Sequence, residues 1–457
     1  MNKSVIHAAF FNFSFEDSML TSICHKKCFA FILFVCIGSQ LLVAKSNIPT
    51  WEVFKKYSNH VVKIQVLANH SVAQSSVGSG FFVSAKGHII TNYHVVSEIV
   101  LNSNKYHGEV VSSDGHIYPL RLIAIDVLHD LALVKIESKI NDFFVLDDLK
   151  VQQGERLLSL GHPHDIGLSI VEGTYNDFLK FTRFKRIHFT GSINGGMSGG
   201  PAILNSGKVV GINVSSAGNQ VSFLVPVKHA LNLYQSSKDK KEAKPDDFIK
   251  SIRDQLYSNQ DLYYQNLLKH SAATMNIGEF NLTNQLSSKF KCWGDLKEEN
   301  EKQLFTLRSH TCFSRDDIYI SKAFITNKVE YQHLHISTGK LNRFRFFSLL
   351  SKYMSEEFYQ NDNQSIENQF TEQRRKLLTN FKCQTATIDQ SGNLIRTVFC
   401  LRAYKLFEGL YDAVFKTVPL DQETESVIST LYLPSISFDN SQKMAKKFLS
   451  EVSWTAK

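Results

Sequence analysis

The sequence of 457 residues predicts a mainly β N-terminal domain followed by an α+β C-terminal region. Short apolar runs separated by glycine-containing turns fill the first half, a pattern typical of β-strands. Apolar periodicity stops and charge rises between Ser236 and Pro245, which indicates a linker. Beyond it, the triplet Phe-Lys-Cys occurs at 290–292 and again at 381–383, which indicates an internal repeat. We therefore expect three parts after the leader, over 46–235, 236–247 and 248–457.

The first 45 residues are typical of an export signal. Two lysines precede an apolar run at 28–37, and polar residues at 38–40 interrupt that run. A continuous membrane span needs about 20 apolar residues, so a cleaved signal peptide is favoured over an anchor. Cleavage is expected after Ala44, and the long irregular stretch before the apolar run indicates that translation starts at Met19. The mature chain is then periplasmic or secreted, without a stable membrane span.

The most informative stretch of the N-terminal domain is 191–201, where four glycines crowd around Ser198 and a proline closes the run. Glycine adopts backbone conformations that other residues resist, so such a run can turn its amides toward one point. Converging amides are what an oxyanion hole requires, and a serine hydroxyl at that point can be a nucleophile. Ordinary tight turns have the same composition, so the interpretation depends on a base and an orienting acid elsewhere.

A candidate base, His94, follows a predicted β-hairpin. Residues 81–83 and 88–91 form two short apolar runs, and Ala-Lys-Gly at 85–87 is a suitable tight turn between them. His94 comes after the second strand and before two valines. On position alone, such a histidine is more often a packed or half-exposed polar residue than a catalytic one.

The candidate acid is Asp130, which opens an alternating Leu-Ala-Leu-Val strand at 131–134. A carboxylate among apolar residues is costly unless it is hydrogen-bonded, and a neighbouring imidazole would supply that bond. Asp126 is the competing acid. Its simpler interpretation is that it is an exposed turn residue before the strand. Asp130 is favoured because it adjoins the strand directly.

These three pieces resemble the trypsin-like serine peptidases, most closely their bacterial HtrA/DegP-like branch. That branch pairs a Gly-Ser-Gly-Phe strand with a Thr-Asn-x-His-Val-Val turn, here at 78–81 and 91–96. Its Asp-Leu-Ala-Leu strand start is here at 130–133, and its Gly-x-Ser-Gly-Gly-Pro loop is at 196–201. The chain order His, Asp, Ser is that of the chymotrypsin type. The resemblance covers roughly residues 55 to 230 and implies a chymotrypsin-like double β-barrel.

The resemblance implies an exported serine endopeptidase that acts through an acyl-enzyme intermediate. Ser198 would attack the peptide carbonyl, His94 would transfer the proton, and Asp130 would orient and stabilise the imidazole. The amides of Gly196 and Ser198 would stabilise the oxyanion. The expected partners are polypeptide substrates, including misfolded or exported proteins, and no metal or organic cofactor is required.

By the same resemblance, the substrate pocket involves four residues near the nucleophile: Ser192, Ile212, Asn213 and Val214. None of them carries a carboxylate, so a preference for arginine or lysine is not expected. A small or medium apolar side chain is the favoured substrate residue at this pocket.

Two residues of the nucleophile loop depart from the related proteins. Gly195 stands where proline is common, which predicts a softer loop and an oxyanion hole that orders on substrate binding. Met197 replaces a polar residue and either covers the nucleophile, lines the leaving-group side or simply packs. In the preceding loop, the Gly-His-Pro-His-Asp run at 161–165 could supply metal ligands, but a loop entering the second barrel is the simpler interpretation.

Part of the formal net charge of +8 lies in one short run of mixed charge at 238–244. A basic excess mixed with acids is typical of a solvated surface. The aromatic and basic pattern of a nucleic-acid module is not found, so no nucleic-acid partner is expected. The oligomeric state has no signal in the sequence.

The C-terminal region is predicted to contain two related units, at about 285–356 and 376–455. Each opens with Phe-Lys-Cys, reaches a second cysteine, and continues into an aromatic strand-like stretch. Each then closes with an amphipathic helix, at 344–354 or 441–452.

The four cysteines after the leader form an even set, which favours disulfides in an exported chain. The repeat predicts the pairs Cys292–Cys312 and Cys383–Cys400. HtrA proteins usually carry PDZ domains in this place, but the carboxylate-binding Gly-Leu-Gly-Phe loop is not found after residue 245. Substrate capture, partner docking and simple stabilisation stay open as roles for the C-terminal region.

The alternative to an enzyme is a catalytically silent binding or chaperone-like protein on the same scaffold. The complete set of triad residues favours the enzyme. A hydrolase with another catalytic order is disfavoured by the chain order and by the lack of a nucleophile-elbow motif.

Overall fold

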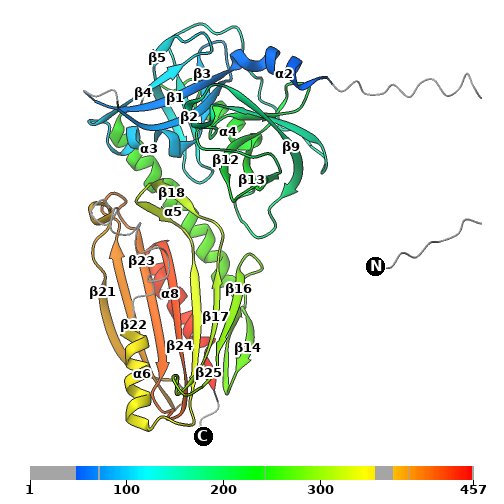
Figure 1. Cartoon of the computed structure of the whole chain (residues 1–457). Coiled ribbons are helices and arrows are strands. Elements are labelled where there is room, and N and C mark those ends of the chain that lie inside the picture. The colour runs from blue at the N-terminus through cyan, green and yellow to red at the C-terminus, as the bar shows by residue number, and fades with distance from the viewer. Residues whose placement is uncertain (1–47, 70–72, 242, 356–373, 391, 455–457) are drawn as a thin grey trace, which may run out of the picture. The chain divides into compact units, whose positions relative to one another are not determined.

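An antiparallel sheet of seven strands, in the order β5-β4-β1-β2-β3-β7-β6, opens the folded chain (Figure 1). Its strands are β1 (Val61–Ala68), β2 (Gln74–Phe82), β3 (His88–Thr91), β4 (Tyr106–Val111), β5 (Ile117–Pro119), β6 (Arg121–Asp126) and β7 (Leu131–Lys135). The computed structural model describes residues 48–69, 73–241, 243–355, 374–390 and 392–454. The predicted signal peptide, its cleavage site and Met19 lie outside these residues.

Six further strands close into a barrel in the order β10-β13-β12-β11-β8-β9. They are β8 (Arg156–Gly161), β9 (Ser169–Phe178), β10 (Ile187–Phe189), β11 (Pro201–Ile203), β12 (Val209–Ser216) and β13 (Ser222–Pro226). The prediction of two closed barrels is therefore wrong for the first one, which is an open half-barrel among the described residues. Its edge strand β5 has only three residues and pairs only with β4, so no ladder joins it to the other edge strand, β6.

Short helices precede, connect or follow these strands: α2 (Thr50–Tyr57), η1 (Ser58–His60), α3 (Tyr93–Leu101), η2 (Pro163–Asp165) and α4 (Val227–Ser237). A shared hydrophobic cluster holds the sheet and the barrel together. Phe81 and Leu133 of the sheet belong to it, as do Leu158 and Ile212 of the barrel, and all four are fully buried. Burial of a large apolar side chain stabilises the fold by roughly 1.5 to 3 kcal/mol, so this cluster fixes the two β-structures against each other.

The long helix α5 (Pro245–Lys269) follows the predicted linker. Proline suits its first position, and the Lys244 amide donates to the Asp247 carboxylate at 3.0 Å, which caps the helix. Its first half buries Phe248 and Ile252 in the cluster under the seven-stranded sheet. Its second half buries Tyr264 in the core of the C-terminal region.

A second antiparallel sheet of seven strands, in the order β16-β17-β20-β24-β23-β22-β21, forms the C-terminal region. Its strands are β16 (Lys291–Lys297), β17 (Thr306–Phe313), β20 (Glu330–Ser337), β21 (Lys382–Gln390), β22 (Asn393–Ala403), β23 (Tyr411–Pro419) and β24 (Glu425–Ile436). Two smaller elements accompany it: the hairpin β18 (Ile318–Ser321) and β19 (Phe324–Thr326), and the sheet of β14 (Ala273–Ile277), β15 (Phe280–Gln285) and β25 (Ser453–Trp454).

Helices α6 (Arg343–Ser355) and α8 (Phe438–Ser450) cover opposite faces of this sheet (Figure 1). On β24, Ile428 packs in the cluster with α6, whereas Leu431 packs in the cluster with α8 and α5. The alternation of side chains along a strand explains why both faces are apolar. The two Phe-Lys-Cys triplets open strands β16 and β21, which are the two edges of the same sheet.

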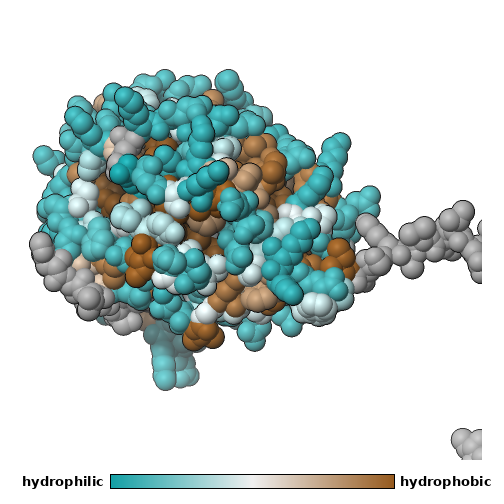
Figure 2. Space-filling view, turned by 90° about the horizontal axis from the view of Figure 1, so that it is seen from above, coloured by the Kyte–Doolittle hydropathy of each residue, from teal (hydrophilic) through white to brown (hydrophobic). Residues whose placement is uncertain are grey.

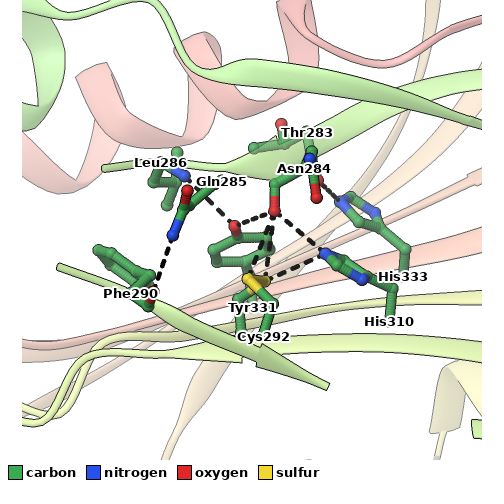
Figure 3. Close-up of a disulfide and its surroundings, with 10 residues drawn as sticks. Thr283, Asn284, Gln285, Leu286, Phe290, Cys292, His310, Tyr331 and His333 are labelled. Atoms are coloured by element: carbon green, nitrogen blue, oxygen red, sulfur yellow. Dashed lines mark hydrogen bonds between the residues drawn. A yellow bond between two sulfur atoms is a disulfide. The ribbon is translucent and has the colours of Figure 1, made fainter. Parts of the chain in front are cut away.

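Both predicted disulfides are present, each between directly paired residues of neighbouring strands. Cys292–Cys312 links β16 to β17, and Cys383–Cys400 links β21 to β22. Figure 3 shows the surroundings of the first, where the Asn284 carbonyl accepts hydrogen bonds from the Tyr331 hydroxyl at 2.8 Å and from Nε2 of His310 at 3.0 Å.

Among the described residues, no helix has both the length and the apolar character needed to cross a bilayer. On the face shown in Figure 2, hydrophilic residues cover most of the surface and hydrophobic residues lie in groups between them.

Candidate active site

His94 is the second residue of α3, directly after the end of β3. The sequence predicts a turn here, whereas the structure begins a helix at Tyr93. Nδ1 of His94 lies 2.6 Å from Oδ2 of Asp130, and the backbone N–H of His94 donates to Oδ1 at 2.9 Å. One carboxylate thus holds both the ring and the backbone of His94, and the ring bond leaves Nε2 as the basic nitrogen.

Asp130 lies in the turn between β6 and β7 with a φ of 59°. Its backbone carbonyl accepts from the Asn92 side chain at 2.8 Å and from the Tyr93 amide at 3.2 Å, which holds this left-handed conformation in place. The competing acid, Asp126, instead contacts His129, whose Nδ1 is 2.7 Å from its carboxylate. The structure therefore pairs His94 with Asp130 and separates it from Asp126.

The electrostatics of His94 follow from this pairing. Burial of the ring opposes protonation, but the charge of Asp130 and its hydrogen bond outweigh burial and raise the pKa of His94. The side chain stays 26% exposed, so the imidazole is held from one side and open on another. A histidine in this setting can accept a proton, and the carboxylate of Asp130 stabilises the imidazolium that forms.

The nucleophile loop packs against β2 and β3, the strands that precede His94. Gly199 has a φ of 87°, and a Cβ there would collide with the Ser79 carbonyl and the Thr91 hydroxyl. Only glycine fits this close approach. The Ser79 amide donates to the Ser198 carbonyl at 2.8 Å, and this hydrogen bond fixes the position of the loop against β2.

Ser79 is a residue whose role the sequence did not reveal. Its hydroxyl donates to the Gly196 carbonyl at 2.7 Å and accepts from the His162 amide at 2.9 Å. It therefore joins the nucleophile loop to the loop after β8. The Gly-Ser-Gly-Phe motif contains Ser79 and could have singled it out. The motif does not indicate which backbone groups its hydroxyl binds.

The Ser198 hydroxyl donates to the Val214 carbonyl at 3.4 Å. No hydrogen bond from Ser198 to His94 is present among the described residues. Hydrogen bonds between nucleophile and base are often long or unformed without substrate, so this conformation leaves the chemistry open to Ser198.

The amides expected to form the oxyanion hole have no hydrogen-bond acceptor within the described part of the chain. Gly196 has a φ of 94°, and a Cβ there would collide with the His162 carbonyl. The Gly195 carbonyl accepts from the His164 amide at 2.7 Å, and in a trans peptide the adjoining N–H of Gly196 points the opposite way. Free amides of Gly196 and Ser198 are the donors that a developing oxyanion needs.

The four predicted pocket residues differ in accessibility. Ile212 and Asn213 are fully buried, so neither is accessible to a substrate in this conformation. The Asn213 amide group donates to the Leu160 carbonyl at 3.1 Å. Ser192 is exposed and Val214 is partly buried, so their side chains remain available to a substrate.

Met197 does not cover the nucleophile. It is fully buried in the barrel core beside Phe189 and Ile193. Of the three alternatives for this residue, the structure shows packing.

The 161–165 loop is tied to β1 by Asp165, and its first histidine is partly buried. Asp165 forms a salt bridge with Lys63 at 2.8 Å. Burial, reinforced by Lys63, lowers the pKa of His162 to about 4. The one candidate metal cluster among the described residues is Cys292, His310 and Cys312, whose sulfurs are joined in a disulfide and cannot act as thiolates.

Comparison with known proteins agrees with this geometry. Residues 78–212 match the family described as "Trypsin-like peptidase domain". These residues are therefore similar to the trypsin-like peptidase domains of HtrA/DegP-like proteins. The domain is 32% identical over 186 residues to a "Probable periplasmic serine endoprotease DegP-like" of Bartonella henselae, covering 36% of this chain and 34% of that protein. It is also 32% identical over 159 residues to "Serine protease HTRA1" of Xenopus laevis, covering 33% of each chain.

The chain spans about a third of the length of the curated relatives that it matches. Among solved structures, it is similar to the serine endoprotease from Yersinia pestis, with 27% identity and a TM-score of 0.36. That match covers 41% of this chain and 67% of the other. The matches to the two curated relatives cover about a third of this chain.

Proposed function

We propose that the chain is an exported serine endopeptidase that uses Ser198, His94 and Asp130. The observation that carries the proposal is the Asp130 carboxylate, which holds both the ring and the backbone amide of His94 at 2.6 and 2.9 Å. This arrangement fixes the tautomer that a general base needs. The family match and the DegP-like relatives support the same reaction class.

In the proposed reaction, Ser198 Oγ attacks the peptide carbonyl while Nε2 of His94 takes its proton. The new oxyanion is stabilised by the amides of Gly196 and Ser198, and loss of one such donor typically costs about 3 kcal/mol. His94 then gives the proton to the leaving amine, and an acyl-enzyme on Ser198 forms. A water molecule, activated by His94, hydrolyses the acyl-enzyme. These steps need no metal or organic cofactor.

Polypeptides are the proposed substrates, including misfolded or exported proteins, and a periplasmic or secreted location is proposed for the chain. The names of the relatives, "periplasmic serine endoprotease" among them, and the leader sequence support both points. At the primary pocket, Ser192 and Val214 favour a small or medium apolar substrate side chain.

A silent binding protein on the same scaffold is the second candidate. The observation that favours it is the hydrogen bond from Ser198 to the Val214 carbonyl, which replaces a bond to His94 in this conformation.

Labelling with a fluorophosphonate separates the two candidates. The folded wild type should be labelled, and Ser198→Ala should lose labelling and casein turnover. Ser206→Ala is a matched control, because Ser206 is an exposed serine whose backbone carbonyl alone bonds Tyr57. Folded wild type that takes no label supports the silent protein, and casein turnover that persists in Ser198→Ala refutes the assignment of the nucleophile.

A further inference from the structure

The hairpin β18–β19 leaves the C-terminal sheet between β17 and β20 and packs on α3, the helix that carries His94. Ile318, Ile320 and Phe324 of the hairpin are buried in one cluster with Tyr93 and Val96 of α3. The C-terminal region therefore reaches the candidate active site through a defined element rather than by a loose surface contact.

Tyr319 of this hairpin contacts the imidazole ring of His94. Its ring centroid lies 5.9 Å from that of the imidazole, in an edge-to-face arrangement with an interplanar angle of 69°. The helix that carries His94 is itself held by Ser97, whose hydroxyl donates to the His94 carbonyl at 3.1 Å. The imidazole of His94 thus packs against one tyrosine of the C-terminal region.

The hairpin is anchored by polar contacts on either side of Tyr319. The Tyr93 hydroxyl donates to the Ile320 carbonyl at 3.0 Å. Just before β18, the Asp316 carboxylate accepts from the backbone amide of Arg183 at 2.6 Å and from its Nε at 3.1 Å. The Asp316 side chain has no exposed surface, so this ion pair is a buried anchor between the hairpin and the loop after β9.

We propose that Tyr319 is a positioning residue for His94, so that the C-terminal region completes the active site. The inference rests on the proposed peptidase function. Asp130 fixes one nitrogen of the imidazole, but a single hydrogen bond leaves the ring free to tilt about it. Tyr319 packs against the ring and restricts that tilt, and reacting groups must be held within a fraction of an ångström of the productive geometry.

The groups that face His94 come from two elements. Asp130 faces it from the β6–β7 turn and Tyr319 from the hairpin, while the half-buried Arg186 acts on Asp130 by charge. Burial is the largest influence on the pKa of His94 and lowers it. Because Tyr319 supplies part of that burial, its removal should raise the pKa of His94 further.

The test uses the full chain and three substitutions at one position. Tyr319→Ala removes the ring, Tyr319→Leu keeps apolar bulk without the ring, and Tyr319→Phe keeps the ring without the hydroxyl. Ile325→Ala is the control, because Ile325 lies on the same hairpin with its side chain exposed. The rate of fluorophosphonate labelling and the titration of His94 by NMR are measured for each folded variant.

We expect Tyr319→Ala and Tyr319→Leu to label about 10- to 100-fold more slowly and to raise the pKa of His94. Tyr319→Phe should restore labelling to within a few-fold of wild type, and Ile325→Ala should match wild type. Wild-type labelling and an unchanged His94 titration in folded Tyr319→Leu would overturn the proposal, whether or not Tyr319→Ala folds. If the wild type takes no label, the proposed function fails instead, and the His94 titration alone decides the role of Tyr319.

Discussion

His94 in the trypsin-like domain and His333 in the C-terminal sheet are both held through their rings, yet their pKa values are shifted in opposite directions. His94 faces the charged Asp130, and its pKa is raised despite burial. His333 donates from Nε2 to the Thr283 carbonyl at 2.9 Å and accepts at Nδ1 from the Ser429 hydroxyl at 2.7 Å. Burial, helped by the nearby His310, lowers the pKa of His333 to about 3.

The difference lies in the charge of the partner and in the access to solvent. Neutral partners satisfy both nitrogens of His333, and its ring stacks on Phe448 with no exposed surface. Such an imidazole is a structural group that stays uncharged. His94 has one nitrogen bound to a carboxylate and part of its surface open, which suits proton transfer. Hydrogen bonding alone does not separate the two roles.

The largest effect is expected at the charge that distinguishes His94. Asp130→Asn keeps the size of the side chain but removes the charge and no longer fixes the tautomer, so the rate of peptide hydrolysis should fall by about 10⁴-fold. The measurement is kcat on a peptide substrate, with circular dichroism to verify folding.

Asp126→Asn is the matched control for this change, because Asp126 makes the same pair of contacts with His129. It should leave kcat within a few-fold of wild type. Equal losses in the two variants would contradict the assignment of Asp130 as the orienting acid.

A smaller effect is expected from the two disulfides of the C-terminal sheet, the first of which lies near His333 through His310. The two bridges close loops of similar length, with sequence separations of 20 and 17, so chain entropy predicts about 3 kcal/mol for each. Cys312 is fully buried whereas Cys383 is exposed, so replacing both cysteines of the first bridge by serine also buries a hydroxyl. Urea unfolding should show the larger loss of stability for that double variant.

The double variant of Cys383 and Cys400 serves as the comparison, and it should lose only the entropic part. A larger loss at this exposed bridge would show that burial around His310 and Tyr331 does not set the difference.

The last expected effect concerns the pH dependence of stability, and it is small over any single pH unit. Because the folded pKa of His333 lies at about 3, below its ordinary value of 6.5, the unfolded chain binds a proton there that the folded chain does not. Stability from this residue is complete above pH 6.5 and is lost as the pH falls toward 3, by at most about 1.4 kcal/mol per pH unit. His333→Gln should flatten this part of the profile in urea unfolding measured from pH 7 to pH 4.

Ser429→Ala is the control, since it removes the hydroxyl partner but retains the imidazole. This variant should be less stable at every pH while keeping the slope of the wild type. An unchanged slope in His333→Gln would mean that other groups dominate the acid response.

Local sequence patterns predicted helices, strands and disulfides, but they did not predict which of these elements contact one another. The strand 88–91, the helix predicted at 344–354 and the paired cysteines agree with β3, α6 and the two disulfides. Glycine spacing around Ser198 and the strand after Asp130 indicated the residues proposed for the site, of which the structure joins His94 and Asp130 by a hydrogen bond. These signals are local, because they depend on turn geometry and on the alternation of side chains along a strand.

The rest depends on contacts between distant residues, which periodicity does not encode. The contact of Tyr319 with His94 joins segments that are far apart in the sequence. The direction of Met197 is set by the barrel core, and closure of the first barrel fails at the short strand β5. Each of these features depends on which parts of the chain pack together, and tertiary packing is determined only when the whole chain folds.

The separation between the hairpin and the helix that it touches has a consequence for biosynthesis. The Tyr93 hydroxyl and its acceptor at Ile320 are 227 residues apart. Translation proceeds at about 5 to 20 residues per second, so a nascent chain presents His94, Asp130 and Ser198 for several seconds before Tyr319 is made. If Tyr319 positions His94, full activity is delayed until the rest of the chain has emerged, which protects the unfinished protein and its neighbours from premature cleavage.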